Sequence, residues 1–125
     1  MASRYGEPLF VISVAARLLE MHPQTLRKYE REGLIAPSRT SGNLRLYSDR
    51  DIERLRQVKY LVEQRGLNLA GVQLALALTS RLRELRAVLG EAERQAPPGA
   101  DGAARLGQEM DEVLAMLGFV EEPAD

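Results

Sequence analysis

The sequence has no cysteine, so it can form no disulfide bond, offer no thiolate to a metal and sense no redox change through a thiol. It has a single histidine, His22, around which no His–Cys metal cluster or catalytic pair can be built. Phosphate-binding loops, dinucleotide-binding turns and nucleophile elbows are also absent from the sequence. We therefore expect neither a bound metal nor a cofactor, and no enzymatic activity.

Long apolar runs are lacking as well. The sequence contains no stretch of about 18 apolar residues, which is the length that a membrane-spanning helix needs. Residues 1–10 contain no apolar stretch behind a basic start, as a secretory signal would. We expect a cytoplasmic protein that does not enter a membrane.

Charge is distributed unevenly along the 125 residues, although the net charge is only −1. Residues 1–66 contain twelve Lys and Arg against eight Asp and Glu, whereas residues 67–125 contain five against ten. A basic first half suits a polyanionic ligand, and an acidic second half suits contacts with protein. Ordinary solvation of surface charge is the alternative explanation.

The first half of the sequence predicts two short helices and a pair of strands. Apolar residues recur at helical spacing before His22, and Pro23 favours the start of a second helix because proline is well tolerated at the first helical position. Gly33 is the expected end of that helix. Two strand-like runs, Leu34–Ala36 and Leu44–Tyr47, flank a loop rich in turn residues. Helix, turn, helix and β-wing in this order are typical of a DNA-binding domain.

The second half predicts further helices. Ser48 should cap a third helix that ends at Gly66, and a fourth helix is expected over residues 70–78. Between Ala75 and Ala92 apolar residues recur at alternating spacings of three and four, which is the heptad pattern of a coiled coil. We expect four leucines of this pattern to form a dimer contact: Leu78, Leu82, Leu85 and Leu89. Packing on the chain's own core would produce the same pattern and is the alternative.

The fold class predicted from these patterns is mainly α. It is a winged helix-turn-helix with a two-stranded β-wing, followed by a C-terminal coiled-coil dimerisation helix. The expected parts are a flexible N-terminus (1–9), a DNA-binding domain (10–79), a dimerisation helix (80–95), a linker (96–102), an amphipathic C-terminal helix (103–118) and an acidic tail (119–125).

The candidate DNA contacts come from the second helix and the wing. Arginine can recognise guanine and glutamine can recognise adenine, whereas lysine and the hydroxyls of threonine and tyrosine more often hold phosphates. A solvated basic helix is the alternative for the helix, and a core position is the alternative for Tyr47. The candidates are His22, Gln24, Thr25, Arg27, Lys28 and Arg31 on the helix, with Arg39, Arg45 and Tyr47 on the wing.

Residues 10–80 resemble the MerR family of winged helix-turn-helix regulators. The matching segments are I-S-V-A-A-R-L-L-E-M-H-P-Q-T-L-R-K-Y-E-R-E-G-L-I in the helices and R-T-S-G-N-L-R-L-Y-S-D-R-D-I in and after the wing. Within the family, M-H-P-Q-T-L-R and L-N-L-A-G-V are most similar to heat-shock repressors of the HspR type. Two positions depart from the family pattern: Lys28 stands where tyrosine is frequent, and Glu20 stands where a turn glycine is common.

The resemblance implies a repressor of heat-shock and chaperone genes. It implies a homodimer joined by an antiparallel coiled coil, an inverted-repeat operator in double-stranded DNA and the chaperone DnaK as co-repressor. It also implies DNA contacts for residues that match the family's helix and wing motifs: Thr25, Arg27, Tyr29, Arg45 and Tyr47. The alternatives are a MerR-type activator that responds to another signal, and a protein-interaction adaptor that acts through its C-terminal helix.

Overall fold

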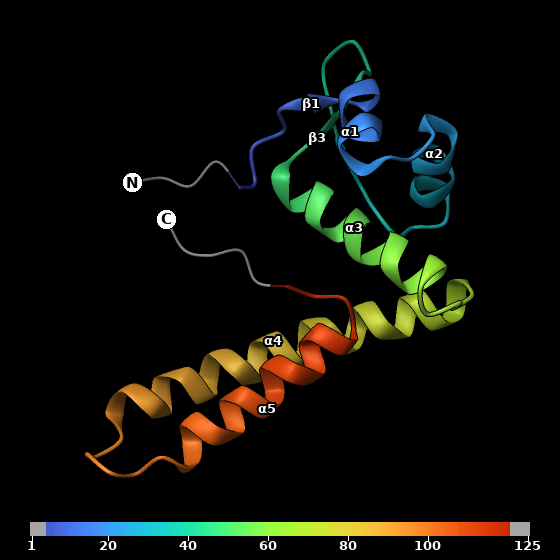
Figure 1. Ribbon diagram of the computed structural model, residues 1–125. Coiled ribbons are helices and arrows are strands. Elements are labelled where there is room, and N and C mark those ends of the chain that lie inside the picture. The colour runs from blue at the N-terminus through green and yellow to red at the C-terminus, as the bar shows by residue number, and fades with distance from the viewer. Residues whose placement is uncertain (1–4, 121–125) are drawn as a thin grey trace. The chain divides into compact units, whose positions relative to one another are not determined.

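The computed structural model describes residues 5–120, and the chain divides into two compact units, Met1–Arg65 and Gly66–Asp125 (Figure 1). The mainly α class, with a helix-turn-helix and a small antiparallel sheet, is confirmed. The elements of the first unit are β1 (Phe10–Val11), α1 (Ile12–Leu19), α2 (Pro23–Arg31), β2 (Ser38–Arg39), β3 (Arg45–Tyr47) and α3 (Asp49–Glu63). Those of the second are α4 (Leu69–Gln95) and α5 (Gly102–Met116).

The turn between α1 and α2 depends on Glu20. This residue adopts the left-handed conformation, with φ 53° and ψ 48°. That conformation costs a residue with a side chain about 1–2 kcal/mol, which is why glycine is favoured at such positions. The Lys59 ammonium on α3 donates to the Leu19 carbonyl at 3.0 Å and so binds the C-terminal end of α1. This contact from α3 helps to hold the turn that sets the direction of α2.

The sheet has three antiparallel strands in the order β1-β3-β2. The prediction of two strands was therefore incomplete, and the prediction of a strand over Leu34–Ala36 was wrong. Leu34 and Ile35 are buried in the core, and the Leu34 carbonyl accepts a hydrogen bond from Arg54 Nε at 2.6 Å. A side chain thus occupies the acceptor that a strand would offer to its neighbour. The strand that pairs with β3 is the later Ser38–Arg39.

The segment before β1 is hydrogen-bonded to the rest of the first unit. The Leu9 amide donates to the Tyr47 carbonyl at 2.9 Å, and the Arg50 amide donates to the Tyr5 carbonyl at 3.0 Å. The Tyr5 hydroxyl also donates to Glu53 at 2.6 Å. Residues 5–9 are thus attached to β3 and α3, in contrast to the flexible N-terminus predicted over 1–9. Residues 1–4 of that segment lie outside the described residues.

Helix α3 begins with the cap expected at Ser48. The Ser48 hydroxyl accepts from the Asp51 amide at 3.1 Å, and the Asp51 carboxylate accepts from the Ser48 amide at 2.9 Å, which completes a capping box. The inner face of α3 is mostly apolar and packs against α1, which in turn packs against α2. Its buried apolar residues are Ile52, Leu55, Val58 and Leu61. Burial of this face fixes the helix-turn-helix on a rigid support.

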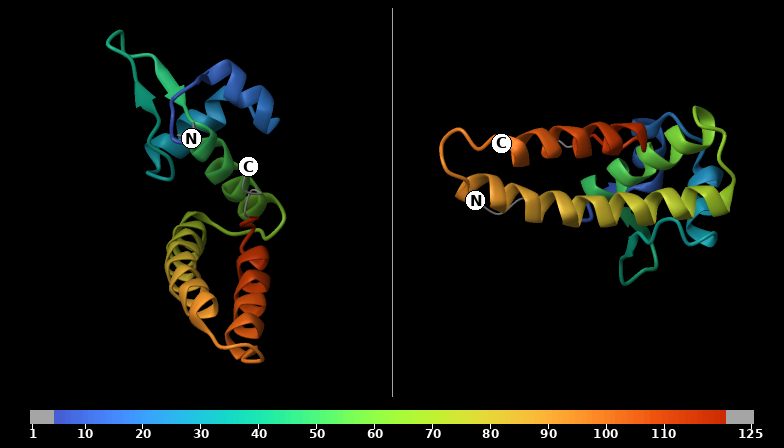
Figure 2. Two further views of the ribbon diagram at one scale, coloured as in Figure 1. Left: turned by 90° about the vertical axis from the view of Figure 1, so that its left-hand side faces the viewer. Right: turned by 90° about the horizontal axis from the view of Figure 1, so that it is seen from below.

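Helices α4 and α5 form an antiparallel hairpin in the second unit (Figure 2). The prediction of a fourth helix that ends at residue 78 was wrong, because α4 continues through residues 79–95 without interruption. No proline or glycine stands at that point, and the buried Thr79 hydroxyl donates to the Ala75 carbonyl at 2.8 Å, within the helix. The Phe119 ring, placed in the acidic tail by the sequence, lies 4.4 Å from the Arg83 guanidinium. Residues 121–125 lie outside the described residues.

Gly107 on α5 lies against the ends of two long side chains of α4. A methyl group at this position would lie 2.9 Å from Arg86 Cζ and 2.5 Å from a carboxylate oxygen of Glu93. The α4 face that contacts α5 includes Arg86, which donates to Asp111 at 3.0 Å and to Glu93 at 3.2 Å. One face of α4 therefore packs on a helix of its own chain. Packing within the chain was the alternative interpretation of the heptad pattern.

Candidate nucleic-acid interface

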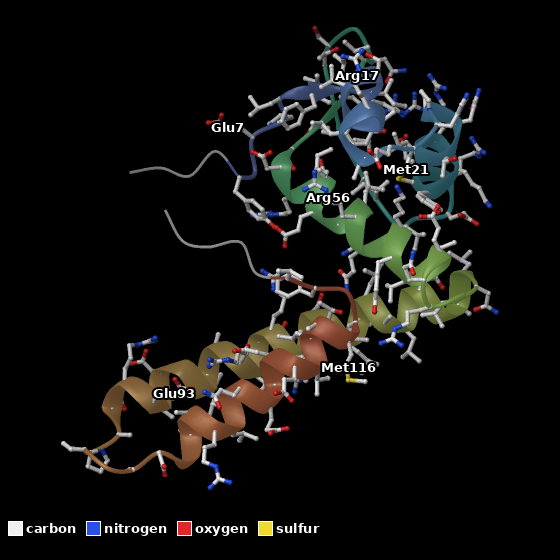
Figure 3. All side chains as sticks on the ribbon, viewed as in Figure 1. Glu7, Arg17, Met21, Arg56, Glu93 and Met116 are labelled. Carbon is white, nitrogen blue, oxygen red and sulfur yellow. The ribbon has the colours of Figure 1, made fainter. Side chains whose placement is uncertain are left out.

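Helix α2 is held by two side chains on its inner face. Leu26 is 0% exposed and Tyr29 is 8% exposed, so the opposite face points away from the core. Positions three and four apart share a helix face. The outer side chains therefore gather together: Gln24, Arg27, Lys28 and Arg31. Figure 3 shows side chains that end in nitrogen reaching outward from α2. Lys28 and Arg31 are exposed and Arg27 is partly exposed, so all three cations reach solvent.

His22 caps the first turn of α2. Its Nδ1 atom accepts a hydrogen bond from the Gln24 amide at 3.1 Å, and the side chain is exposed. Because Nδ1 accepts, the proton of this tautomer is on Nε2, which is free to donate to an external acceptor. His22 can thus order the helix start and offer a donor to a phosphate at the same time. Thr25, in the same turn, is partly exposed.

We expect His22→Ala to lower the free energy of unfolding by about 1 kcal/mol, because the Gln24 amide would lose its partner at the helix start. Thermal denaturation followed by circular dichroism would measure the change. His22→Asn is the matched control, since asparagine is a good N-cap acceptor and should restore most of the stability. Equal stability of the alanine and asparagine variants would contradict a capping role.

The wing arginines converge on Glu30. Arg39 Nη2 lies 2.7 Å from one carboxylate oxygen of Glu30, and Arg45 Nε lies 2.5 Å from the other. Arg39 also donates from Nη1 to the Asn43 carbonyl at 3.2 Å. Arg39 and Arg45 are directly opposite each other on β2 and β3. The two guanidiniums, which are candidate DNA contacts on the wing, are held against α2.

The carboxyl group of Glu30 is ionised as a result. Burial by itself would raise its pKa, but the hydrogen bonds from Arg45 and Arg39 and the attraction of both charges outweigh burial and lower the pKa below its usual value. Glu30 was not among the site residues predicted from the sequence. The available signal was a pair of arginines in one hairpin, because like charges on facing strands are unfavourable unless an acid lies near them.

The two tyrosines among the candidates belong to the core. Tyr47 is 0% exposed, and its hydroxyl has no hydrogen-bond partner among the described residues. Burial raises the pKa of Tyr47 and of Tyr29. The alternatives for Tyr47 were a DNA contact and a core position, and in the structure its side chain lies in the core. The side chain of Tyr29 also faces inward. Both rings therefore serve the core, and the contacts of their hydroxyls with DNA stay a prediction.

The candidate dimer residues occupy two environments. Leu78 and Leu85 are about half exposed, whereas Leu82 and Leu89 are partly buried.

Within residues 5–120, no cluster of three or more His, Asp or Glu could hold a metal ion. Over the same residues no helix is both long enough and apolar enough to cross a membrane.

Comparison with known proteins identifies the family of this chain. Residues 10–79 match the family model described as MerR HTH family regulatory protein. The chain is 52% identical over 84 residues to a Streptomyces coelicolor protein described as the heat shock protein HspR, a match that covers 67% of this chain and 56% of that protein. It is 37% identical over 81 residues to the transcriptional regulator GlnR of Bacillus cereus, covering 65% of this chain and 62% of GlnR.

A more distant relative is the transcriptional regulator MlrA of Escherichia coli, 37% identical over 70 residues, which are 55% of this chain and 28% of MlrA. The chain therefore spans less than two thirds of the length of these relatives. The shared region contains the helix-turn-helix, the wing and α3. Because the family model covers more than half of the chain, the chain belongs to the MerR family of helix-turn-helix regulatory proteins, which are transcription regulators and not enzymes.

Proposed function

We propose that this protein is a sequence-specific DNA-binding repressor of heat-shock and chaperone genes. The observation that carries the proposal is the outer face of α2, on which Arg27, Lys28 and Arg31 lie together opposite the buried Leu26. A helix with this face fits the major groove, where arginine and glutamine recognise base edges. The similarity to a protein described as the heat shock protein HspR supports the choice of genes.

The roles of the side chains follow from their positions. Arg27 and Gln24 would contact bases, because they lie on the outer face of α2. Phosphate contacts would come from the remaining polar groups at the rim: His22, Thr25, Lys28, Arg31, Arg39 and Arg45. Phosphate contacts orient the protein on the duplex, while base contacts supply specificity. Bound at a promoter, the protein would repress by blocking or distorting the DNA.

A homodimer would bring two α2 helices to an inverted repeat. The proposed contact uses α4 residues Leu78 and Leu85, which are exposed beside the partly buried Leu82 and Leu89. Successive residues of a helix are about 100° apart around the helix axis. When one residue faces the neighbouring helix, the residue directly before it in the sequence therefore lies to one side of the contact. In an antiparallel pair this side is the same for both helices. The exposed Leu106 and Val113 on α5 should therefore extend the same apolar surface.

The chaperone DnaK is the proposed co-repressor, so that unfolded protein, by binding DnaK, would release repression in the cytoplasm. A gel-shift assay tests the whole proposal: the protein is added to DNA from upstream of its own gene, with and without DnaK. We expect a specific complex that DnaK strengthens. A complex that DnaK does not change would remove the co-repressor from the proposal, and no complex at low salt would remove DNA binding itself.

We expect Arg27→Ala to weaken operator binding by about 1–3 kcal/mol while binding to random DNA changes much less, because a guanidinium on a base edge contributes mainly to specificity. Fluorescence anisotropy with both duplexes at one salt concentration would measure the two affinities. Lys28→Ala is the comparison variant, and it should weaken both complexes to a similar extent. An equal loss on both duplexes for Arg27→Ala would assign this residue to phosphate.

A further inference from the structure

The Glu30 carboxylate connects three elements that are separate in the sequence. Glu30 is on α2, Arg39 is on β2 and Arg45 is on β3. Each carboxylate oxygen accepts from a different arginine, at 2.7 Å and 2.5 Å. The three side chains are between one fifth and about one third exposed, so the cluster is partly shielded from water. A single acid therefore joins the proposed recognition helix to both strands of the wing.

The contact leaves part of each guanidinium available. A guanidinium has five N–H donors arranged in one plane. Arg45 uses its Nε toward Glu30, and among residues 5–120 its two terminal nitrogens have no hydrogen-bond partner, so both can bind another acceptor. Arg39 binds Glu30 through Nη2 and the Asn43 carbonyl through Nη1, so its side chain is fixed at two points. Both planes are oriented before any ligand arrives, and unused donors remain for a phosphate.

We propose that Glu30 is a positioning residue, which orders Arg39 and Arg45 so that the wing and α2 approach DNA as one unit. This inference rests on the DNA-binding function proposed above. Long side chains that become immobilised during binding reduce affinity, and side chains that are already ordered avoid this loss. The acid also offsets the mutual repulsion of two arginines on facing strands. Its effect on binding therefore passes through the two arginines.

The negative charge of Glu30 has an opposite effect that the test must separate. An acid near DNA repels phosphates, so its removal by itself should favour binding to any duplex. Two exposed charges at the protein surface interact weakly at physiological salt. We therefore expect the loss of order to exceed the gain from charge on a specific duplex. On a non-specific duplex the gain should prevail.

The test uses the full chain and two labelled duplexes. One duplex is selected by the wild-type protein from a random pool, and the other is a scrambled sequence of the same composition. Glu30→Gln should bind the selected duplex about tenfold more weakly and the scrambled duplex equally or more tightly. The ratio of the two affinities should therefore fall. Fluorescence anisotropy over a range of salt concentrations supplies the affinities and the salt slopes.

Two variants separate position from charge. Glu32→Gln removes the same charge close by at the C-terminal end of α2, and no hydrogen bond joins Glu32 to the wing among the described residues. It should leave the affinity ratio near the wild-type value. Glu30→Asp keeps the charge but is one methylene shorter, so it cannot reach both arginines from the same backbone position. It should lower the ratio with no change in net charge, even if Glu30→Gln is poorly folded.

The decisive arm uses the Arg39→Ala/Arg45→Ala background. If Glu30 acts through the arginines, adding Glu30→Gln to this background should have no more effect than adding Glu32→Gln. A full additional tenfold loss in that background would overturn the inference, as would equal behaviour of Glu30→Gln and Glu32→Gln in the wild-type background. Failure of the wild-type chain to enrich any duplex would instead refute the proposed DNA-binding function.

Discussion

Replacing Leu26 by alanine is expected to lower the free energy of unfolding by about 2–5 kcal/mol and to weaken DNA binding with it. Leu26 is 0% exposed and is one of the two buried side chains of α2, the other being Tyr29. Truncation removes the transfer free energy of the side chain and leaves a cavity that the packed helices cannot fill completely. Small domains are stable by only about 5–15 kcal/mol, so this loss is a large fraction. Urea denaturation followed by circular dichroism measures it.

Leu44→Ala is the matched control for this experiment. Leu44 lies in the same unit and is 50% exposed, so the same truncation should change the free energy of unfolding by less than about 0.5 kcal/mol. The two variants separate support of α2 from loss of a leucine in general. If Leu26→Ala and Leu44→Ala unfold at the same urea concentration, α2 does not depend on this core contact, and its outer face would lack the rigid base that recognition requires.

The second large effect is expected from Leu78→Asp combined with Leu85→Asp. Leu78 is 47% exposed and Leu85 is 46% exposed, so neither substitution should disturb the α4–α5 hairpin. In the proposed dimer both positions would face the partner chain, where an unpaired carboxylate is strongly unfavourable. The dimer dissociation constant should rise by roughly two orders of magnitude or more. Sedimentation velocity over a range of concentrations measures the change.

Ser80→Asp serves as the control for added charge, because Ser80 is exposed and lies on another side of α4. It should sediment as the wild-type protein does. A double variant that still forms the wild-type dimer would refute the proposed contact. If that variant also fails to respond to DnaK in the gel shift, the apolar surface would instead belong to the chaperone, as in the adaptor alternative.

The elements that local signals define were predictable. The starts of α2 and α3 follow from Pro23 and Ser48, and their ends follow from Gly33 and Gly66, which adopt positive φ as expected for residues after a helix. These residues act through their own backbone geometry, or through a partner within one helical turn. The outer face of α2 could be predicted for the same reason, because helical spacing determines which side chains share a face.

The features that depend on distant contacts were not predictable in the same way. Strand β1 has two residues and is defined only by its pairing with β3, about 36 positions later in the chain. The contact of Glu30 with Arg45 is also made only in the folded state. Apolar spacing showed that α4 must pack against a helix, but it could not show that α5 of the same chain occupies one of its faces. Apolar periodicity identifies a buried face and leaves its partner open.

The pairing of β1 with β3 has a practical consequence for handling the protein. Phe10 lies opposite Tyr47, and the Leu9 amide extends the pairing by one further hydrogen bond. A shortened chain that starts after Val11 would look harmless from the sequence, yet it would expose one edge of the central strand. Purification tags and crystallisation truncations are therefore better placed so that residues 5–11 are kept intact.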